Sequence, residues 1–414
     1  MPILVHKYGG TSMGSVERIL SNARRIERDR DSNYQVAVVV SAMAGETNRL
    51  IDLADQIDPR GSARERDMLA SAGEQVSIAL MAMALHSIGI DAVSFTATQA
   101  GIRTDRFHQR AKILSIDSER LHDVLDSGGV PVVAGFQGIT DTMEVTTLGR
   151  GASDTTAAAI AASLEAERCD IYTDVDGVYA ADPRIVPGAK RLERVSYDEM
   201  LELAGAGSKV LQTRSVLFAK KYHVPLQVLS SFEDKPGTLI SEEAPVMEDV
   251  VVTGIASDRS ESRVTLRGIP DQPGIAADIF EALAAEGISV DMIIQSRGHD
   301  NLANISYTVG KTDLSDAVNV TEGLVKTLKA REMGVDEKIA KVSVVGVGMK
   351  SSGGVAARVF RTLADNGINI HLISTSEIRI STVIDEDHTE PAVRALAKEF
   401  DLIEEAAEET VAAS

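Results

Sequence analysis

The sequence predicts an α/β protein: a mostly parallel sheet covered by helices in three layers, followed by two ferredoxin-like βαββαβ repeats. Short β-branched runs alternate with amphipathic or Ala-rich stretches between Ile3 and Leu229. An acidic, Pro-containing stretch, Glu242–Asp249, then interrupts this pattern. The rest of the chain contains two similar copies of one segment. Strands separated by helices favour right-handed crossovers and a parallel sheet buried on both faces.

Six short runs in the first part have the composition of strands, and four intervening stretches that of helices. The strand candidates are Ile3–Val5, Val36–Val40, Ala92–Phe95, Val130–Ala134, Asp170–Thr173 and Leu226–Leu229. The helix candidates are Val16–Arg30, Arg64–Leu85, Thr155–Glu167 and Ser208–Tyr222.

The internal repeat is visible as three pairs of similar segments. Each copy has the order strand, helix, strand, strand, helix, strand, which is the ferredoxin-like pattern. These patterns predict an α/β domain over 1–240, a linker and domain entry over 241–261, and repeats over 262–337 and 338–414. The paired segments are Arg263–Ile269 with Lys341–Val347, Gly274–Phe280 with Gly354–Phe360, and Gly287–Val290 with Gly367–Ile370.

Composition excludes several classes of protein. The 414 residues carry a formal charge of −20, few aromatic side chains and no Trp, so neither a basic footprint nor stacking platforms for nucleic acid are present. The single Cys169 is expected to be a buried thiol. The first apolar run, Ile3–Val5, ends at His6-Lys7, and Val76–Leu85 is about half a membrane span. We therefore expect a cytoplasmic protein with no membrane or nucleic-acid partner.

The segment Lys7-Tyr-Gly-Gly-Thr-Ser12 follows the first predicted strand directly. Two glycines let the backbone approach a ligand closely, and Thr11 and Ser12 are candidate helix caps. Free N–H groups at a helix start suit phosphate, and Lys7 adds a positive charge at the strand end. An ordinary strand-to-helix turn is the alternative.

Other polar segments lie directly before predicted helices or after a predicted strand. Arg150-Gly-Ala-Ser-Asp154 precedes an Ala-rich helix, which Ser153 or Asp154 can cap. Thr173–Tyr179, followed by Asp182-Pro-Arg184, leaves a strand where α/β sheets bind ligands. Glu74 begins a helix, and Lys209 lies near another helix start; each has a purely structural explanation as well.

Taken together, these segments resemble aspartate kinases of the amino-acid kinase family over nearly the whole chain, and the repeats look like that family's paired ACT domains. The ordered segments are Lys7–Ser12, Ser41-Ala-Met43 with Thr47, Gly73-Glu74, Thr147–Gly151 with Ser153-Asp154, and Thr173–Tyr179. The resemblance implies ATP-dependent phosphorylation of the L-aspartate side chain to 4-phospho-L-aspartate, the first step towards lysine, threonine and methionine.

The resemblance also implies a role for individual residues. Lys7 and Asp154 are the expected catalytic centre, with Lys7 on the transferring phosphoryl group. The expected aspartate-binding residues are Ser41, Thr47, Glu74, Arg150 and Ser153. The expected nucleotide-binding residues are Gly9, Gly10, Thr11, Ser12, Gly151, Thr173, Asp174, Tyr179, Asp182, Arg184 and Lys209. The expected effector-binding residues are Asp271, Gly274, Ile275, Ala276, Gln295, Asn369 and Ile370.

The chemistry of aspartate agrees with these roles. Glu74 can pair with the ammonium of aspartate, and Arg150 can bind both oxygens of its α-carboxylate. The β-carboxylate has a reference pKa of about 3.9, so it is already ionised and needs no general base. We therefore expect Asp154 to position Lys7 and the phosphates. Magnesium is expected to arrive with ATP, because no dedicated metal cage is evident.

The sequence departs from the family at three places. Ala152 stands where a second glycine is usual, and its methyl either crowds the phosphates or points away. The first repeat has Gln295-Ser296-Arg297 and Leu302-Ala303-Asn304 where Gln-Asn-Val and Thr-Thr-Asp runs are usual. Lysine, threonine or both are the expected effectors, and these changes at Ser296 and Asn304 leave the effector's identity open.

Other interpretations remain. The chain can be a kinase for glutamate or acetylglutamate, although the tandem repeats and Gly73-Glu74 favour aspartate. It can also be an inactive amino-acid sensor, but the presence of Lys7, Glu74, Arg150 and Asp154 argues against this. A homo-oligomer through the ACT repeats is expected. A short subunit starting at Met247 is conceivable, but an ordinary linker methionine is the simpler interpretation.

Overall fold

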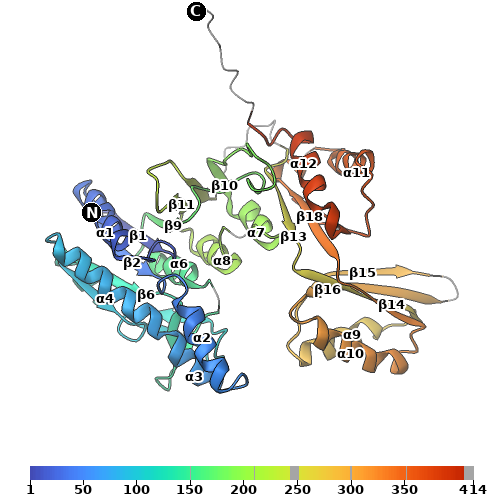
Figure 1. The fold of residues 1–414 in the computed structure, drawn as a ribbon, viewed down its shortest axis with the longest axis horizontal. Helices are drawn as coiled ribbons and strands as arrows, with labels where there is room; N and C mark the ends of the chain where they lie inside the picture. The colour runs from blue at the N-terminus through green and yellow to red at the C-terminus, as the bar shows by residue number, and fades with distance from the viewer. Residues whose placement is uncertain (150, 209, 243–250, 299–300, 351, 405–414) are drawn as a thin grey trace, which may run out of the picture. The chain divides into compact units, whose positions relative to one another are not determined.

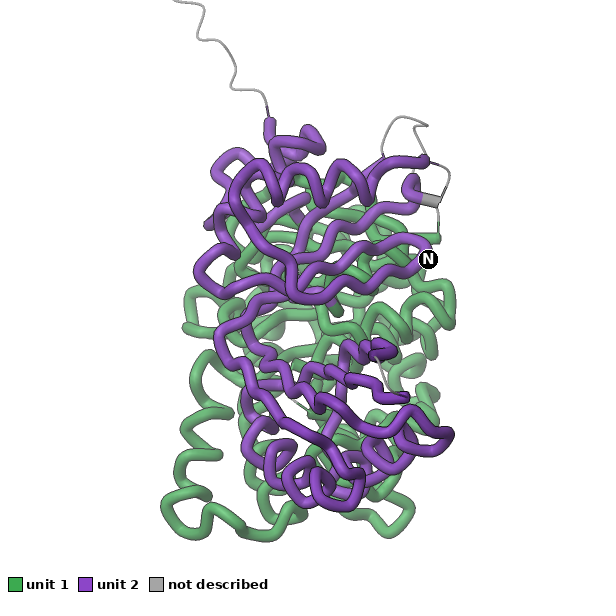
Figure 2. Tube along the Cα trace, turned by 90° about the vertical axis from the view of Figure 1, so that its right-hand side faces the viewer, with its two compact units in different colours: residues 1–178, 191–205, 209–246 green, residues 179–190, 206–208, 247–414 purple. Residues whose placement is uncertain are grey.

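The computed structural model describes residues 1–149, 151–208, 210–242, 251–298, 301–350 and 352–404. Two compact units divide the chain (Figure 2). The first contains residues 1–178, 191–205 and 209–246; the second contains residues 179–190, 206–208 and 247–414. Two short segments of the expected 1–240 domain thus cluster with the second unit.

An eight-stranded sheet forms the centre of the first unit in its described part, in the order β10-β12-β11-β9-β1-β2-β6-β3. All its neighbours pair in parallel except β11 and β12, which are antiparallel. The mostly parallel fold class is therefore confirmed. The strands are β1 (Ile3–Tyr8), β2 (Gln35–Val40), β3 (Ala92–Phe95), β6 (Val130–Ala134), β9 (Arg168–Thr173), β10 (Arg194–Ser196), β11 (Leu226–Ser230) and β12 (Thr238–Ser241).

Helices cover both faces of this sheet (Figure 1). On one face, α1 (Val16–Asp31) and α4 (Ala72–Ser87) enclose a core with the even-numbered side chains of β1 and β2. On the other face, the Ala-rich α6 (Ser153–Ser163) lies against β1, with α8 (Thr213–Tyr222) beside it. Successive strand side chains point to opposite faces, so β1 directs Lys7 towards α6 and His6 towards α1.

The expected helix at Arg64–Leu85 is two helices, α3 (Ala63–Ala70) and α4, which meet at Ser71. Among the described residues, this stretch is the one helical segment long and apolar enough to cross a membrane. However, 56% of its apolar 18-residue window is buried inside the protein, and Ile78, Met81 and Leu85 of this stretch belong to the core. Its apolar composition is thus accounted for by burial against the sheet.

A small second sheet in the first unit was not anticipated from the sequence. Its order is β5-β4-β7-β8, with β4 (Ile102–Thr104), β5 (Ile113–Ile116), β7 (Gln137–Ile139) and β8 (Val145–Thr147). Strands of three or four residues carry too little alternation to be recognised from sequence. The remaining helices of this unit are α2 (Glu46–Ile57), α5 (Glu119–Asp126) and α7 (Tyr197–Gly205).

The first repeat has the expected βαββαβ order. Helices α9 (Ile275–Ala285) and α10 (Leu314–Thr327) cover a sheet of order β15-β16-β14-β17. The core between them includes Leu266, Ile279 and Tyr307. The strands are β14 (Glu261–Pro270), β15 (Val290–Arg297), β16 (Leu302–Gly310) and β17 (Glu332–Asp336).

The second repeat differs from the expected order, because its outer strand comes from the segment before the first repeat. The sheet order is β13-β18-β20-β19, and β13 (Gly254–Asp258) pairs antiparallel with β18 (Ile339–Val345). The expected boundaries at 262 and 338 therefore miss this strand. The other elements are the 3₁₀ helices η1 (Val347–Lys350) and η2 (Glu386–His388), α11 (Val355–Asp365), α12 (Thr389–Glu399), β19 (Leu372–Thr375) and β20 (Arg379–Asp385).

A buried lysine links the two repeats within the second unit. Lys341 on β18 donates to Glu261 on β14 at 2.6 Å and also pairs with Asp291 on β15. Nearby, Met292 packs against Ile339 and other apolar residues of the second repeat. Because a buried charge is tolerated only when it is paired, this lysine fixes which strands of the two repeats meet.

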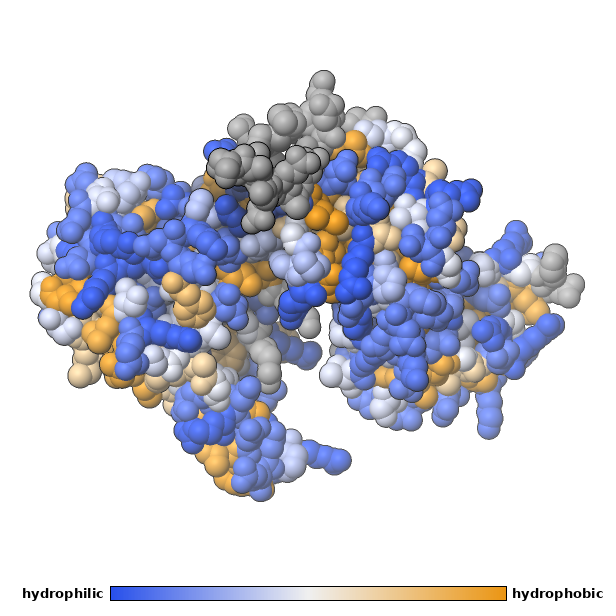
Figure 3. Space-filling model, turned by 45° about the horizontal axis from the view of Figure 1, so that its top comes forward, coloured by the Kyte–Doolittle hydropathy of each residue, from blue (hydrophilic) through white to orange (hydrophobic). Residues whose placement is uncertain are grey.

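The surface agrees with the acidic composition. The face drawn in Figure 3 is mostly hydrophilic, with apolar side chains in scattered patches. The charge of −20 is carried by such a surface, so any anionic ligand requires a local positive site.

Candidate active site

An ion pair marks the carboxyl end of β1. Lys7 Nζ lies 2.5 Å from Asp154 Oδ1 in the first turn of α6, and both side chains are 10% exposed. Cys169, on the adjacent strand β9, is fully buried as expected, and burial raises the pKa of its thiol. The structure therefore brings the two predicted catalytic residues together in a largely dehydrated place.

The glycine loop after β1 is held by close backbone contacts. Gly9 N donates to Tyr172 O at 3.2 Å, and a Cβ atom at Gly10 would come within 3.1 Å of Ala42 O. The hydroxyl of Ser12 is buried and donates to Tyr172 O at 3.2 Å. A side chain at position 10 would therefore crowd the segment that contains Ala42.

The predicted helix caps in this loop are wrong. Helix α1 begins at Val16, and its N-cap is Ser15, whose Oγ accepts from Arg18 N at 3.4 Å. Thr11 is exposed, and its carbonyl accepts from the Arg18 guanidinium at 2.6 Å. The loop is thus longer than a direct strand-to-helix turn.

A cavity of about 390 Å³ opens beside this loop. Residues from six separate parts of the first unit line it, and six of the residues predicted to bind aspartate or nucleotide are among them. Those six are Gly10, Ser41, Thr47, Glu74, Gly151 and Ser153.

Glu74 has the most strongly shifted pKa among the residues that line the cavity. It is 2% exposed, its Oε1 accepts from Ala42 N at 3.1 Å, and its Oε2 has no hydrogen-bond partner among the described residues. Burial raises the pKa of Glu74 to about 7. A buried carboxylate with a free oxygen in a cavity is suited to a cationic group of a ligand.

The start of α6 differs from the expected capping. Ala152 occupies the N-cap position with φ −78°, and Ser153 and Asp154 are the first two helical residues. The Ala152 side chain is 3% exposed and packs with Ala111 and Leu148. Of the two interpretations of its methyl, the structure therefore supports burial in an apolar cluster.

The predicted nucleotide residues are divided between the two units. Thr173 and Asp174 follow β9 in the first unit, where Thr173 Oγ1 donates to Asp174 Oδ1 at 3.2 Å. Tyr179, Asp182 and Arg184 belong to the second unit; there the Arg184 guanidinium lies 2.6 Å from Asp182 Oδ2. Arg150, Lys209 and Met247 lie outside the described residues.

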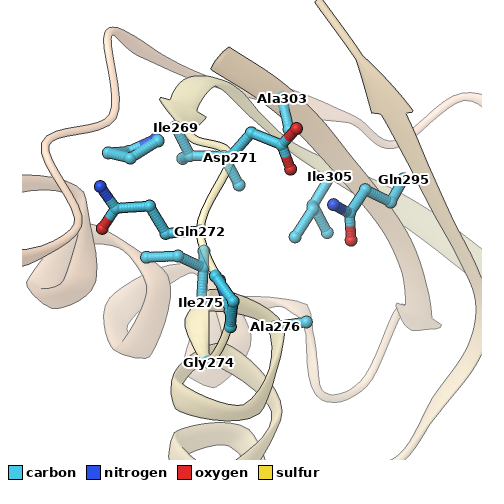
Figure 4. A pocket seen from close by; sticks show the side chains of 11 residues that line it. Ile269, Asp271, Gln272, Gly274, Ile275, Ala276, Gln295, Ala303 and Ile305 are labelled. Atoms are coloured by element: carbon cyan, nitrogen blue, oxygen red, sulfur yellow. The ribbon is translucent and has the colours of Figure 1, made fainter. Parts of the chain in front are cut away.

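A second cavity, of about 330 Å³, lies in the first repeat. Figure 4 shows Gln295 and Ile305 beside the turn that leads into α9. Five predicted effector residues line it: Asp271, Gly274, Ile275, Ala276 and Gln295. Gly274 is the N-cap of α9, with φ +100°, a conformation that favours glycine.

The remaining predicted effector residues are not among those that line this cavity. Asn369 and Ile370 precede β19 and do not lie on a strand. Asn304 Oδ1 accepts from Gly268 N at 3.0 Å, while Ser296 is exposed. The neighbouring Arg297 pairs with Asp271, Nε to Oδ2, at 2.9 Å.

Sequence reasoning missed part of the first cavity's wall. Phe136, Asp67 and Gln109 line it, and so does Thr147, which was noted only as part of a motif. Phe136 and Gln109 adopt positive φ values of 67° and 64°, which no local sequence pattern indicates. Asp67 lies in a helix far along the chain from its partners, so only the folded structure shows its role.

Comparisons with known proteins identify the family. Residues 2–230 match the amino acid kinase family, and residues 264–322 and 342–400 match an ACT domain. The chain is 52% identical to an aspartate kinase of Stutzerimonas stutzeri over 97% of this chain and 98% of that one.

Solved structures agree. The structure matches E. coli aspartokinase III in complex with aspartate and ADP, with a TM-score of 0.81, 27% identity, and coverage of 96% of this chain and 99% of that one. It matches the same enzyme in complex with lysine and aspartate with a TM-score of 0.74, 28% identity and the same coverage. The chain therefore belongs to the aspartate kinase family, with an amino acid kinase domain followed by ACT domains.

Proposed function

We propose that the 390 Å³ cavity binds L-aspartate and that the loop after β1 receives the phosphates of ATP, so that the γ-phosphoryl group passes to the β-carboxylate. The products are 4-phospho-L-aspartate and ADP. The observation that carries this proposal is Glu74, a buried residue that lines the same cavity and whose Oε2 has no hydrogen-bond partner among the described residues.

Glu74 supplies one end of the substrate site. An α-ammonium that donates to Oε2 would satisfy the unpartnered oxygen and offset the cost of burying the charge. Ser41, Thr47 and Ser153 offer hydroxyls to the carboxylates, and Arg150 is proposed to hold the α-carboxylate. The substrate class is therefore a small amino acid with a second carboxylate.

Lys7 and Asp154 supply the reacting end. The β-carboxylate is ionised at neutral pH, so the reaction needs alignment and charge neutralisation more than a general base. Asp154 holds the Lys7 ammonium at 2.5 Å, where it can stabilise charge on the transferring phosphoryl group. Thr173, Asp174, Tyr179, Asp182, Arg184 and Lys209 are proposed to contribute to nucleotide binding.

Magnesium is proposed to accompany the nucleotide. The described residues contain no group of three or more His, Cys, Asp or Glu side chains arranged to hold a metal. The ion would neutralise phosphate charge, which is its usual contribution to phosphoryl transfer. At the transferring phosphoryl group itself, the chain's own contribution is then proposed to come from Lys7, Asp154 and the glycine loop.

We further propose that the 330 Å³ cavity of the first repeat binds an aspartate-family amino acid, lysine or threonine, which lowers activity. The lysine complex of E. coli aspartokinase III supports lysine as the first candidate. The N-terminus of α9 offers N–H groups to an α-carboxylate, and Asp271 can accept from an ammonium. A cytoplasmic homo-oligomer acting at the start of lysine, threonine and methionine synthesis remains part of this proposal.

The direct test is turnover of ATP with a panel of amino acids, with hydroxylamine present to trap acyl phosphates as hydroxamates. We expect aspartate hydroxamate and ADP in equal amounts. A hydroxamate of glutamate or acetylglutamate would reassign the substrate, and no ATP turnover with any amino acid would favour an inactive sensor.

A further inference from the structure

We infer that Asp67 is a positioning residue for the aspartate site: its carboxylate holds the Gln109 and Thr147 side of the cavity in place. Asp67 lies on α3, is 1% exposed and lines the 390 Å³ cavity. The inference rests on the proposed placement of aspartate in that cavity.

Three donors from two other chain segments converge on this carboxylate. Thr147 Oγ1, at the end of β8, donates to Oδ1 at 2.6 Å. Gln109 N donates to Oδ2 at 2.9 Å and to Oδ1 at 3.2 Å. His108 Nδ1 lies 2.8 Å from Oδ2 and must be the donor, because the carboxylate can only accept.

These contacts hold a conformation that the loop would not adopt unaided. Gln109 has φ +64°, an uncommon value for a residue with a side chain, and its N–H is aimed at the carboxylate. The same loop is tied to β8 through Ala111 N, which donates to Thr147 O at 3.0 Å. Losing Asp67 would therefore free the Gln109 N–H and the Thr147 hydroxyl, while this backbone bond would remain.

The anchoring also extends to the loop that leads into α6. Arg214 on α8 donates to Leu148 O at 2.5 Å and to Ala111 O at 2.9 Å. The segment from Thr147 to Asp154 carries Gly151 and Ser153 of the cavity wall. Asp67 and Arg214 thus bind the adjacent residues Thr147 and Leu148 at the start of that segment, and of the two only Asp67 lines the cavity.

His108 provides a test that avoids the cavity itself. It is not among the residues that line the cavity, and its side chain is 20% exposed, so it acts through Asp67. His108→Ala removes one donor, whereas His108→Asn returns an amide N–H close to the position of Nδ1. Asp105→Asn is the matched control, because Asp105 accepts from Phe107 N and Lys112 N in the same loop but does not line the cavity.

Steady-state kinetics on the full chain measure the outcome. We expect Asp67→Asn and His108→Ala to raise the aspartate KM, by about tenfold for Asp67→Asn, since charge-assisted hydrogen bonds are lost. The ATP KM and kcat should stay within about twofold, and His108→Asn should restore most of the aspartate KM. If Asp67→Asn does not fold, the two His108 variants decide alone.

Two results would overturn the inference while leaving the kinase assignment intact. One is an aspartate KM that does not change in His108→Ala, provided that the wild-type chain phosphorylates aspartate. The other is an equal rise in the KM values of aspartate and ATP, which would indicate a general loss of structure. A wild-type chain that does not phosphorylate aspartate would instead reject the proposed function.

Discussion

Lys7 on β1 and Asp154 on α6 form an ion pair of 2.5 Å in which both side chains are nine-tenths buried. Burial makes the pair sensitive to the loss of either partner, because the other charge is then left in a poorly hydrated place. The pair also sets the Lys7 ammonium beside the glycine loop, since a Cβ atom on Gly9 would lie 3.4 Å from Lys7 Nζ.

Lys7→Ala should therefore lower kcat by about a hundredfold or more and change the aspartate KM much less. The charge of Lys7 matters most in the transition state, where phosphoryl charge moves, and electrostatic groups of this kind typically contribute that much. Initial-rate kinetics at varied aspartate and ATP measure both constants. Lys112→Ala, an exposed lysine in the same unit, is the control, and a kcat within threefold of wild type for Lys7→Ala would reject the assigned role.

The parts of the fold that could be predicted are those with a strong local signal. The β-branched runs on β1, β2 and β6 correspond to strands buried on both faces, and the repeated Gly274 and Gly354 turns each precede a helix. Strand β13 could not be assigned to the second repeat from the sequence, because the whole first repeat separates it from its partner β18. Its affiliation depends on tertiary pairing that no local pattern records.

The site likewise has a part that local sequence motifs predict and a part that only the folded structure shows. Lys7, Glu74 and Asp154 stand in recognisable motifs at element ends, and the structure places them around one cavity or beside it. Asp67 gains its importance only from His108, Gln109 and Thr147, which are distant in sequence. Capping was mispredicted at Ser12 and Asp154, because α1 begins later and is capped by Ser15, while α6 begins after Ala152 and has no side-chain capping bond.

The pKa of Glu74 predicts how stability depends on pH. Burial raises the pKa of Glu74 in the folded state to about 7 from its ordinary value of 4.5, so the folded chain binds the proton more tightly than the unfolded chain. The contribution of Glu74 to stability is therefore most favourable below pH 4.5 and is lost as pH rises to about 7. Glu74→Gln should raise Tm, and raise it more at pH 8 than at pH 5.5.

Thermal unfolding of both proteins at the two pH values measures this difference. Glutamine keeps an oxygen that can accept from Ala42 N, so the comparison isolates the charge. Glu233→Gln, at an exposed position, is the control. An equal Tm shift at both pH values would show that the charge of Glu74 does not cause it.

The same pKa predicts the pH dependence of substrate binding. The ammonium of aspartate prefers the ionised Glu74, but near pH 6 the free site is mostly protonated because the pKa is about 7. The aspartate KM should therefore fall as pH rises from 6 to 8. In Glu74→Gln the KM should be higher, by roughly tenfold to a hundredfold, and should lose this slope. A slope that persists in the variant would assign it to another group.

Ala152→Gly tests whether the departure from the family's usual glycine affects the nucleotide. The methyl is buried with Ala111 and Leu148, and φ is an ordinary −78° at this position. We expect the ATP KM and kcat to stay within about twofold and stability to fall by about 1 kcal/mol, from lost burial and added chain freedom. Denaturant unfolding and kinetics check the two parts, with Ala162→Gly in the same helix as a control. A markedly lower ATP KM would show that the methyl crowds the phosphates.

An ion pair competes with the proposed effector for Asp271, a carboxylate that lines the 330 Å³ cavity of the first repeat. Asp271 is the carboxylate proposed to accept the effector's ammonium, yet Arg297 holds it at 2.9 Å. An ammonium must displace or share this partner, which lowers affinity. The Arg297 side chain is 77% exposed, so solvent screens the pair and its contribution is small, about 0.2–1 kcal/mol.

Arg297→Val should therefore tighten effector binding by about two- to fivefold, because Asp271 is released at the cost of one exposed ion pair. Calorimetry with lysine and with threonine measures affinity, and rate assays show whether inhibition shifts to lower concentration in parallel, as linkage between the two sites requires. Arg361→Val removes a similarly exposed arginine from the second repeat and should change nothing. Weaker binding in Arg297→Val would mean that the guanidinium contacts the effector's carboxylate. If neither amino acid, alone or together, binds the wild type at millimolar concentration, the proposed effectors are wrong, and the aspartate kinase assignment stands on the first unit alone.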